Sequence, residues 1–145
     1  MFQMFPLLGV SLIVYAVITM TGVGDLVTST GDILPWYEVI IVPLTLVSGD
    51  EWRITWGAVF LLMSMGFLFV ELVRATQTST ESLFNHALSF ILFVISLLLF
   101  IMVPGYGNTI FFIFLSMTFL DPMAGFIVTN VTARRDFAVT EGVGR

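Results

Sequence analysis

Apolar residues form four long runs along the chain, separated by stretches rich in charged and turn-forming residues. The runs cover about 5–23, 54–73, 83–103 and 109–133. A helix needs roughly 20 mainly apolar residues to cross the hydrocarbon core of a bilayer, because it rises only about 1.5 Å per residue. Each run meets that length, so the pattern predicts four transmembrane helices.

Turn-forming residues indicate how the last two predicted helices are connected. Only the stretch from Pro104 to Asn108 lies between the third and fourth runs, and it includes Gly105 and Gly107. Such a short stretch of helix-breaking residues reverses the chain tightly. The third and fourth helices are therefore predicted to be antiparallel neighbours.

The predicted outer loop, residues 24–53, has a different pattern. Its apolar part, 37–47, is too short to cross a bilayer and contains Pro43. Short extended segments flank a glycine-containing turn at 47–51, which favours a β-hairpin. We expect an extramembrane hairpin, or a re-entrant element, between the first two helices. Four amphipathic rings are expected to anchor one membrane interface at this end: Trp36, Tyr37, Trp52 and Trp56.

Composition agrees with a membrane protein. Hydrophobic residues make up 58% of the chain and charged residues 10%, with a mean hydropathy of +1.05. Soluble proteins average about 25% charged residues. The predicted fold class is therefore all-α, a four-helix transmembrane bundle with a short hairpin between helices 1 and 2, forming a single integral membrane domain over residues 1–145.

Charge and cysteine content remove several function classes. The chain has no cysteine, so it has no disulfide, thiolate metal site or cysteine nucleophile. Its formal net charge is −5 and all of its basic residues are arginines, without a basic stripe. Nucleic acid is therefore not an expected partner, whereas the lipid bilayer is.

The placement of arginine predicts the orientation in the membrane. Arg74 follows the second run and three arginines lie in the tail, residues 134–145, whereas the outer loop has only Arg53 among five acidic residues. Basic residues concentrate on the cytoplasmic side of membrane proteins. Both termini and the tail are therefore expected in the cytoplasm, and in a bacterium the acidic loop would face the periplasm.

Asp121 is the residue that a bilayer should most strongly exclude. It lies about 18 Å into the fourth run, counted from the run's outer end at about 1.5 Å per residue. A carboxylate at that depth costs roughly 2.5–3.5 kcal/mol, so it should face the bundle interior. Pro122 removes a backbone donor and displaces the carbonyl of Thr118. The three residues predict a kinked, polar-lined intramembrane site.

Besides the binding of a partner or a lipid headgroup, two interpretations of the Asp121 site remain open. In the first, Asp121 belongs to a proton- or cation-linked site. In the second, it holds helices together by hydrogen bonds, for example to Ser64, Ser89 or Ser96 on other spans. A single buried acid favours the second interpretation, because proton relays usually need several.

A second group of polar residues is expected at the cytoplasmic interface. Glu71 and Arg74 lie three residues apart on one helix and could pair. His86 begins the third run, and Arg134 and Arg135 end the fourth. We expect them to form a belt of charges that closes the bundle. Glu71 with His86 could also pass a proton, but one histidine and one carboxylate do not complete a metal site.

Other chemistry is not expected from this sequence. His86 and Asp121 are predicted to lie at different depths, so a serine-type catalytic triad is not expected. No phosphate-binding glycine loop occurs. The phenylalanine-rich third and fourth runs are assigned to packing and lipid contact rather than to a pigment or quinone. We therefore expect no catalytic residue, no metal and no cofactor.

Two stretches of the chain resemble a known class of proteins. The residues from Asp121 to Phe126, leading to Thr132–Phe137, and the stretch from Trp56 to Thr76, followed by His86–Ser89, resemble small four-helix inner-membrane proteins of bacteria that lack an assigned function. The resemblance covers roughly the last 90 residues. It implies an inner-membrane location but no activity. It supports these residues as the ones to test: Asp121, Glu71, Arg74, His86, Arg134 and Arg135.

The sequence supports a choice of functions. The first is a non-enzymatic membrane interaction or accessory protein, which assembles with itself or with a membrane partner. The alternative is a small proton- or cation-linked channel or transporter that uses Asp121, and which would need oligomers because four helices leave little room for a pore. A lipid-modifying enzyme is the least expected of the three.

Overall fold

The computed structural model describes residues 5–75 and 80–142, with side chains over 5–74 and 84–127. The fold is mostly helical. It contains α1 (Leu7–Thr21), α2 (Trp56–Ala75), α3 (Thr80–Met102) and α4 (Thr109–Gly142). Stretches of α2, α3 and α4, each of 19 residues with a mean hydropathy of 1.9 to 2.3, are long and apolar enough to cross a membrane. The 15-residue α1 is apolar but shorter.

Short strands occupy the segment between α1 and α2. Strand β1 (Leu26–Val27) pairs with β2 (Ile33–Leu34), and β3 (Ile40–Thr45) pairs with β4 (Glu51–Thr55), both antiparallel. The one-turn helix η2 (Trp36–Glu38) lies between the two hairpins. The predicted hairpin around residues 47–51 is thus confirmed, whereas the β1–β2 hairpin was not predicted.

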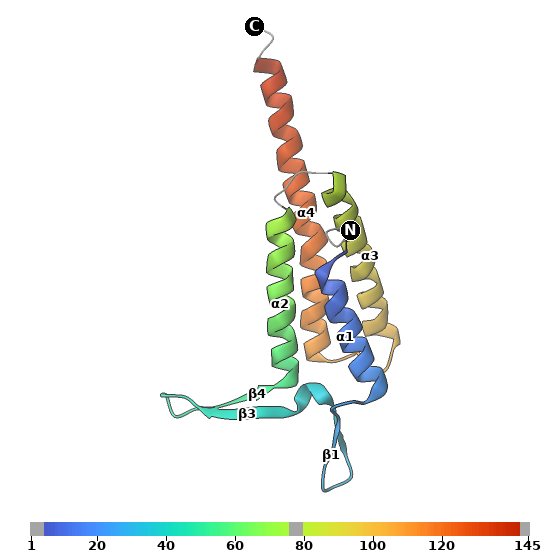
Figure 1. Ribbon diagram of the computed structural model, residues 1–145, viewed down its shortest axis with the longest axis vertical. Helices are drawn as coiled ribbons and strands as arrows, with labels where there is room; N and C mark the ends of the chain where they lie inside the picture. Colours follow the sequence, from blue (N-terminus) through green and yellow to red (C-terminus); the bar gives the residue numbers. More distant parts are fainter. Residues whose placement is uncertain (1–4, 76–79, 143–145) are drawn as a thin grey trace.

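The four helices lie side by side in a bundle (Figure 1). α4 packs against α2 and α3, and α1 packs against α2 and α3. The last part of α4 extends past the ends of the other helices. The predicted antiparallel pairing of the third and fourth helices is confirmed, because α3 and α4 are joined by the tight turn at 103–108.

The inner faces of the helices carry small and polar residues as well as large apolar ones. On α2 the inward positions recur every three or four residues, as on any helix face; they are Gly57, Phe60, Ser64, Leu68 and Glu71. Large apolar residues such as Phe69 and Leu62 are exposed instead. Lipid is as apolar as leucine, so close packing and hydrogen bonding select the interior positions of a membrane bundle.

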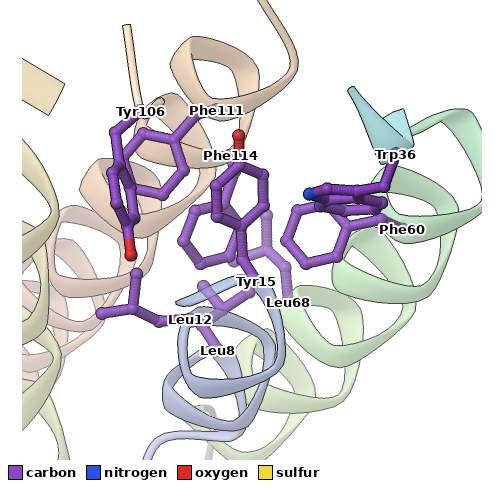
Figure 2. Close-up of a cluster of buried hydrophobic side chains, with 9 residues drawn as sticks. All are labelled: Leu8, Leu12, Tyr15, Trp36, Phe60, Leu68, Tyr106, Phe111 and Phe114. Atoms are coloured by element: carbon purple, nitrogen blue, oxygen red, sulfur yellow. The ribbon is translucent and has the colours of Figure 1, made fainter. Parts of the chain in front are cut away.

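An aromatic core fills the end of the bundle near the α3–α4 turn (Figure 2). Fully buried Tyr15 of α1 lies at its centre, with ring centroids 4.8 Å from Phe111, 5.2 Å from Trp36 and 5.3 Å from Phe60. Tilted and edge-on ring pairs at such distances add to the stabilisation from buried area. This core ties α1, η2, α2 and α4 together.

Asn108 completes the hydrogen bonds at this end. Its Oδ1 accepts the backbone N–H of Phe111 at 2.9 Å and so caps the N-terminus of α4. Its Nδ2 donates to the hydroxyl of Tyr15 at 2.7 Å and to the carbonyl of Gly105 at 3.0 Å. The turn residue therefore joins the start of α4 to the buried tyrosine of α1.

Two expectations from the sequence are corrected by this arrangement. Trp36 is only 5% exposed and packs in the aromatic core, so it does not anchor a membrane interface, whereas Trp52 and Trp56 are half exposed. Pro122 does not interrupt the fourth helix, because α4 continues through it to Gly142. The loss of one backbone hydrogen bond is tolerated inside a long helix that is packed on two sides.

Candidate functional site

Two carboxyl groups, Glu71 of α2 and Asp121 of α4, are buried together inside the bundle. Each is only 1% exposed, and their side chains interact. They come from separate helices that pack against each other over much of their length. We call Glu71, Asp121, His86 and Ser89 the carboxylate cluster.

Glu71 binds the N-terminus of α1. Its Oε1 accepts the backbone N–H of Leu7, the first residue of that helix, and the N–H of Leu8 also interacts with it. Pro6 precedes the helix, and no side chain of α1 itself caps it. The first amides of a helix need acceptors and favour negative charge. Glu71 therefore serves as the missing cap, supplied from α2.

Asp121 has neighbours but no hydrogen bond of normal geometry. Ser89, His86 and Glu71 are the side chains that act on it. Within the described part of the chain, neither oxygen of Asp121 has a hydrogen-bond partner, nor does Oε2 of Glu71. Buried polar atoms are nearly always paired, so these three oxygens are exceptions that mark the carboxylate cluster as a candidate site.

His86 lies directly on the backbone of α4. A Cβ atom built on Gly125 would be 2.2 Å from Nδ1 of His86. Real atoms cannot approach so closely, so only glycine at 125 leaves space for the ring. Gly125 lies four residues after Asp121, on the same face of α4. The glycine thus places the imidazole beside the carboxylate.

His86 also reaches the outside of the bundle. A groove of about 460 Å³ opens between α3 and α4, lined by His86, Ala87, Phe90, Pro122, Met123, Gly125 and Phe126. Its wall is apolar apart from the imidazole. His86 is therefore the residue that connects buried Asp121 with the outer surface.

Buried small polar side chains surround the carboxyl groups. Ser89 donates to the Asn85 carbonyl at 3.0 Å, and Thr118 donates to the Leu115 carbonyl at 2.8 Å. Both hydroxyl hydrogens therefore bond to the helix backbone, one turn earlier. Ser64 and Ser96 are fully buried and have no hydrogen-bond partner among the described residues. Of the three serines expected to contact Asp121, only Ser89 does.

In the structure, Glu71 and His86, which were expected at the cytoplasmic interface, lie next to Asp121. His86 and Asp121 were expected at different depths, and that expectation is wrong. Counted from the α3–α4 turn, His86 lies 16 residues from Met102 and Asp121 lies 12 residues from Thr109. The difference of four residues is about 6 Å, which two side chains can bridge.

Of the arginines in the expected charge belt, the structure describes the side chain of Arg74 only. Glu71 points into the bundle toward Leu7 and makes no ion pair with Arg74 within the described residues, where Arg74 is exposed. Arg74 acts on Glu71 electrostatically, but the amides of α1 bind the carboxylate. The backbone of Arg134 and Arg135 continues α4, but their side chains lie outside the described residues.

The chemistry open to the cluster is narrow. No group of three His, Cys, Asp or Glu residues that could hold a metal ion occurs in the described ranges. A serine-type triad needs a serine hydroxyl that donates to histidine, but Ser89 donates to the Asn85 carbonyl. The arrangement can bind and release a proton between two carboxyl groups and an imidazole.

Comparison with known proteins adds no function to this site. No family model, no curated protein and no solved structure matches the chain. The functional argument therefore rests on the geometry of the cluster.

Proposed function

We propose that this chain is an integral protein of a bacterial inner membrane that crosses the bilayer four times, with both termini in the cytoplasm. Three helices of sufficient length support this, together with the packing of apolar α1 against two of them. At 15 residues α1 is about 22 Å long, less than the hydrocarbon core of about 30 Å. Its N-terminus can lie inside the bundle because Glu71 satisfies it.

The function that the site supports best is a proton- or cation-linked one, centred on Asp121. The observation that carries it is a fully buried carboxyl group without a hydrogen-bond partner, next to a second carboxyl group and an imidazole. Titratable residues inside a membrane are costly and usually mark ion or proton pathways. Sequence alone offered one buried acid, whereas the cluster combines three titratable groups.

The proton has a specific place in this proposal. Two charged carboxylates that interact inside an apolar bundle would repel strongly, so the pair holds a proton. This proton is shared by the two carboxyl groups, while Oε1 of Glu71 stays bound to the α1 amides. His86, which lines the groove between α3 and α4, is the base that accepts this proton.

A flux assay tests this function. The purified protein in liposomes is compared with Asp121→Asn, which keeps the size and the hydrogen-bonding capacity of the side chain but cannot release a proton. We expect proton or cation flux in the wild type and its loss in Asp121→Asn. A wild type without flux would remove the proposal, and flux that survives the substitution would exclude Asp121 from the pathway.

A second function, a non-enzymatic accessory protein that assembles with itself or with a membrane partner, is favoured by a different observation. The β3–β4 hairpin projects away from the bundle and its residues are largely exposed (Figure 1). Cross-linking in native membranes should then recover a defined homo-oligomer or a stoichiometric partner. Recovery of a lone monomer would contradict it.

A periplasm-active reporter fused after Arg145 tests the proposed orientation. It should be silent if the C-terminus lies in the cytoplasm.

A further inference from the structure

The paired strands of the hairpin of β3 and β4, residues 40–55, have one apolar face. Leu44 pairs with Trp52, and Val42 pairs with Ile54. Residues directly opposite each other in an antiparallel pair share a face, as do residues two apart on one strand. These four side chains therefore lie together on one side of the ribbon.

The opposite face is polar and includes an ion pair. Pro43 pairs with Arg53, and Thr45 pairs with Glu51. Nη2 of Arg53 donates to Oε2 of Glu51 at 3.2 Å. Over the paired strands the ribbon is thus amphipathic, with Arg53 and Glu51 on one side, whereas Asp50 lies in the turn opposite Leu46.

The described part of the chain leaves most of the apolar face exposed, although Ile54, next to α2, is half-buried. Leu44 is 42% exposed and Trp52 is 54% exposed, and Val47 at the tip of the turn is fully exposed. An isolated two-stranded hairpin is marginally stable in water, and large apolar side chains left in water make it less so. The apolar face therefore needs an apolar environment from outside the chain.

The direction of the ribbon indicates which environment is available. β4 ends at Thr55 and α2 begins at Trp56, with no linker between them, and the N–H of Trp56 donates to the Val39 carbonyl at 3.1 Å. The ribbon runs across the long axis of the bundle rather than along it (Figure 1). Where α2 enters a bilayer, the ribbon therefore extends along the bilayer surface, over about 20 Å for six residues.

We propose that the β3–β4 ribbon lies flat on the bilayer at the headgroup level, with Val42, Leu44, Trp52 and Ile54 toward the acyl chains and the Arg53–Glu51 pair toward water. This inference rests on the proposal that the helices cross a membrane. Trp52, and Trp56 at the start of α2, are the amphipathic rings that favour this depth. The unpaired outer edges of the two strands exclude a deeper, re-entrant position, because open edges are not tolerated in hydrocarbon.

Site-directed spin labels test the ribbon directly. The chain has no native cysteine, so single cysteines can be labelled without background. Leu44→Cys and Thr45→Cys are matched neighbours on opposite faces, and both sites are exposed, so neither change should disturb the fold. Ile95→Cys on the exposed face of α3 is the reference for membrane insertion. Trp52→Cys and Glu51→Cys repeat the comparison on β4.

Accessibility to oxygen, which concentrates in lipid, is compared with accessibility to a water-soluble nickel chelate in proteoliposomes. We expect oxygen to dominate at 44, 52 and 95, and the chelate to dominate at 45 and 51. Chelate access at both 44 and 45, with oxygen access at 95, would place the ribbon in water. This result would overturn the inference about the ribbon but not the proposed membrane location. A label at 44 that is screened from both reagents would show a protein partner or a second copy instead, and would also overturn the inference about the ribbon. Chelate access at 95 would overturn the proposed membrane location itself.

Discussion

The aromatic core and the carboxylate cluster lie at different levels of the same bundle, and they treat buried polar atoms differently. In the aromatic core, the polar side-chain atoms of Tyr15, Trp36 and Asn108 all have hydrogen-bond partners. For example, the indole N–H of Trp36 donates to the hydroxyl of Thr19 at 3.1 Å. In the cluster, both oxygens of Asp121 and one of Glu71 have none within the described residues. In a structural core, buried polar atoms typically all have hydrogen-bond partners. Buried polar atoms without partners therefore mark a candidate functional site.

The two regions also differ in the kinds of ionisable side chain that they contain. Burial raises the pKa of the Tyr106 and Tyr37 hydroxyls above the usual value of 10.0, so both stay neutral near physiological pH. The carboxylate cluster instead combines two buried carboxyl groups with an imidazole.

The largest expected effect comes from the aromatic core. Tyr15→Ala removes a fully buried ring with four aromatic neighbours and should lower the free energy of unfolding by about 3–5 kcal/mol. Unfolding by SDS from detergent micelles, followed by near-ultraviolet circular dichroism, measures it. Phe112→Ala is the control, because that ring is 53% exposed and should matter much less. Equal losses in both variants would contradict a core centred on Tyr15.

Replacing Glu71 and Asp121 in turn should show which of the two carboxyl groups stabilises the fold. Glu71→Leu leaves the N–H of Leu7 without an acceptor and should cost about 2–3 kcal/mol. Asp121→Leu removes no hydrogen bond and relieves the burial of a carboxyl group, so we expect a change within about 1 kcal/mol or a gain in stability. The same SDS titration compares them. If Asp121→Leu proved the more damaging change, Asp121 would be the structural acid and its proposed role would be lost.

Sequence was sufficient for the apolar parts of α2, α3 and α4, because an apolar run of about twenty residues is typical of a membrane-spanning helix, whereas α1 is shorter than the predicted span of 5–23. It was also sufficient for the β3–β4 hairpin, where Gly49, with a φ of 92°, permits the turn at 47–51. It could not decide which face of each helix is buried, because both faces are apolar and lipid does not select between them. The positions of Ser64, Glu71, Ser89 and Asp121 were the available signal for the inner faces.

The sequence predicted which residues of the carboxylate cluster matter, but not that they lie together. Asp121, Glu71 and His86 were each chosen from sequence, yet Glu71 and His86 were assigned to an interfacial belt. Depth had been judged from the limits of the apolar runs, whereas the α3–α4 turn sets the actual register of His86 against Asp121. The cap that Glu71 provides to α1 could not be foreseen, because it joins residues 64 apart in the sequence.

Gly125→Ala should disturb the cluster from a residue that carries no charge. The new methyl group would overlap the His86 ring, so the imidazole must move away from Asp121, at a cost of about 1–2 kcal/mol. The matched control is Gly66→Ala on α2, where nothing lies within 4 Å and stability should hold or improve. Addition of His86→Ala should recover most of the loss from Gly125→Ala. Independent, additive effects of the two changes would mean that the ring and the glycine are not in contact.

The smallest effect is expected at Asn108, where two roles can be separated. Asn108→Ala removes the cap on the Phe111 N–H together with the bond to Tyr15, and should cost about 1 kcal/mol. Asn108→Asp keeps an oxygen for the cap and adds a negative charge at the start of α4, where it is favourable, but it loses the donor to Tyr15 and Gly105. It should therefore cost less than the alanine variant in the same SDS titration. If the aspartate variant were the less stable one, the link from the turn to Tyr15 would outweigh the helix cap, and the aromatic core would depend on that hydrogen bond as well as on ring packing.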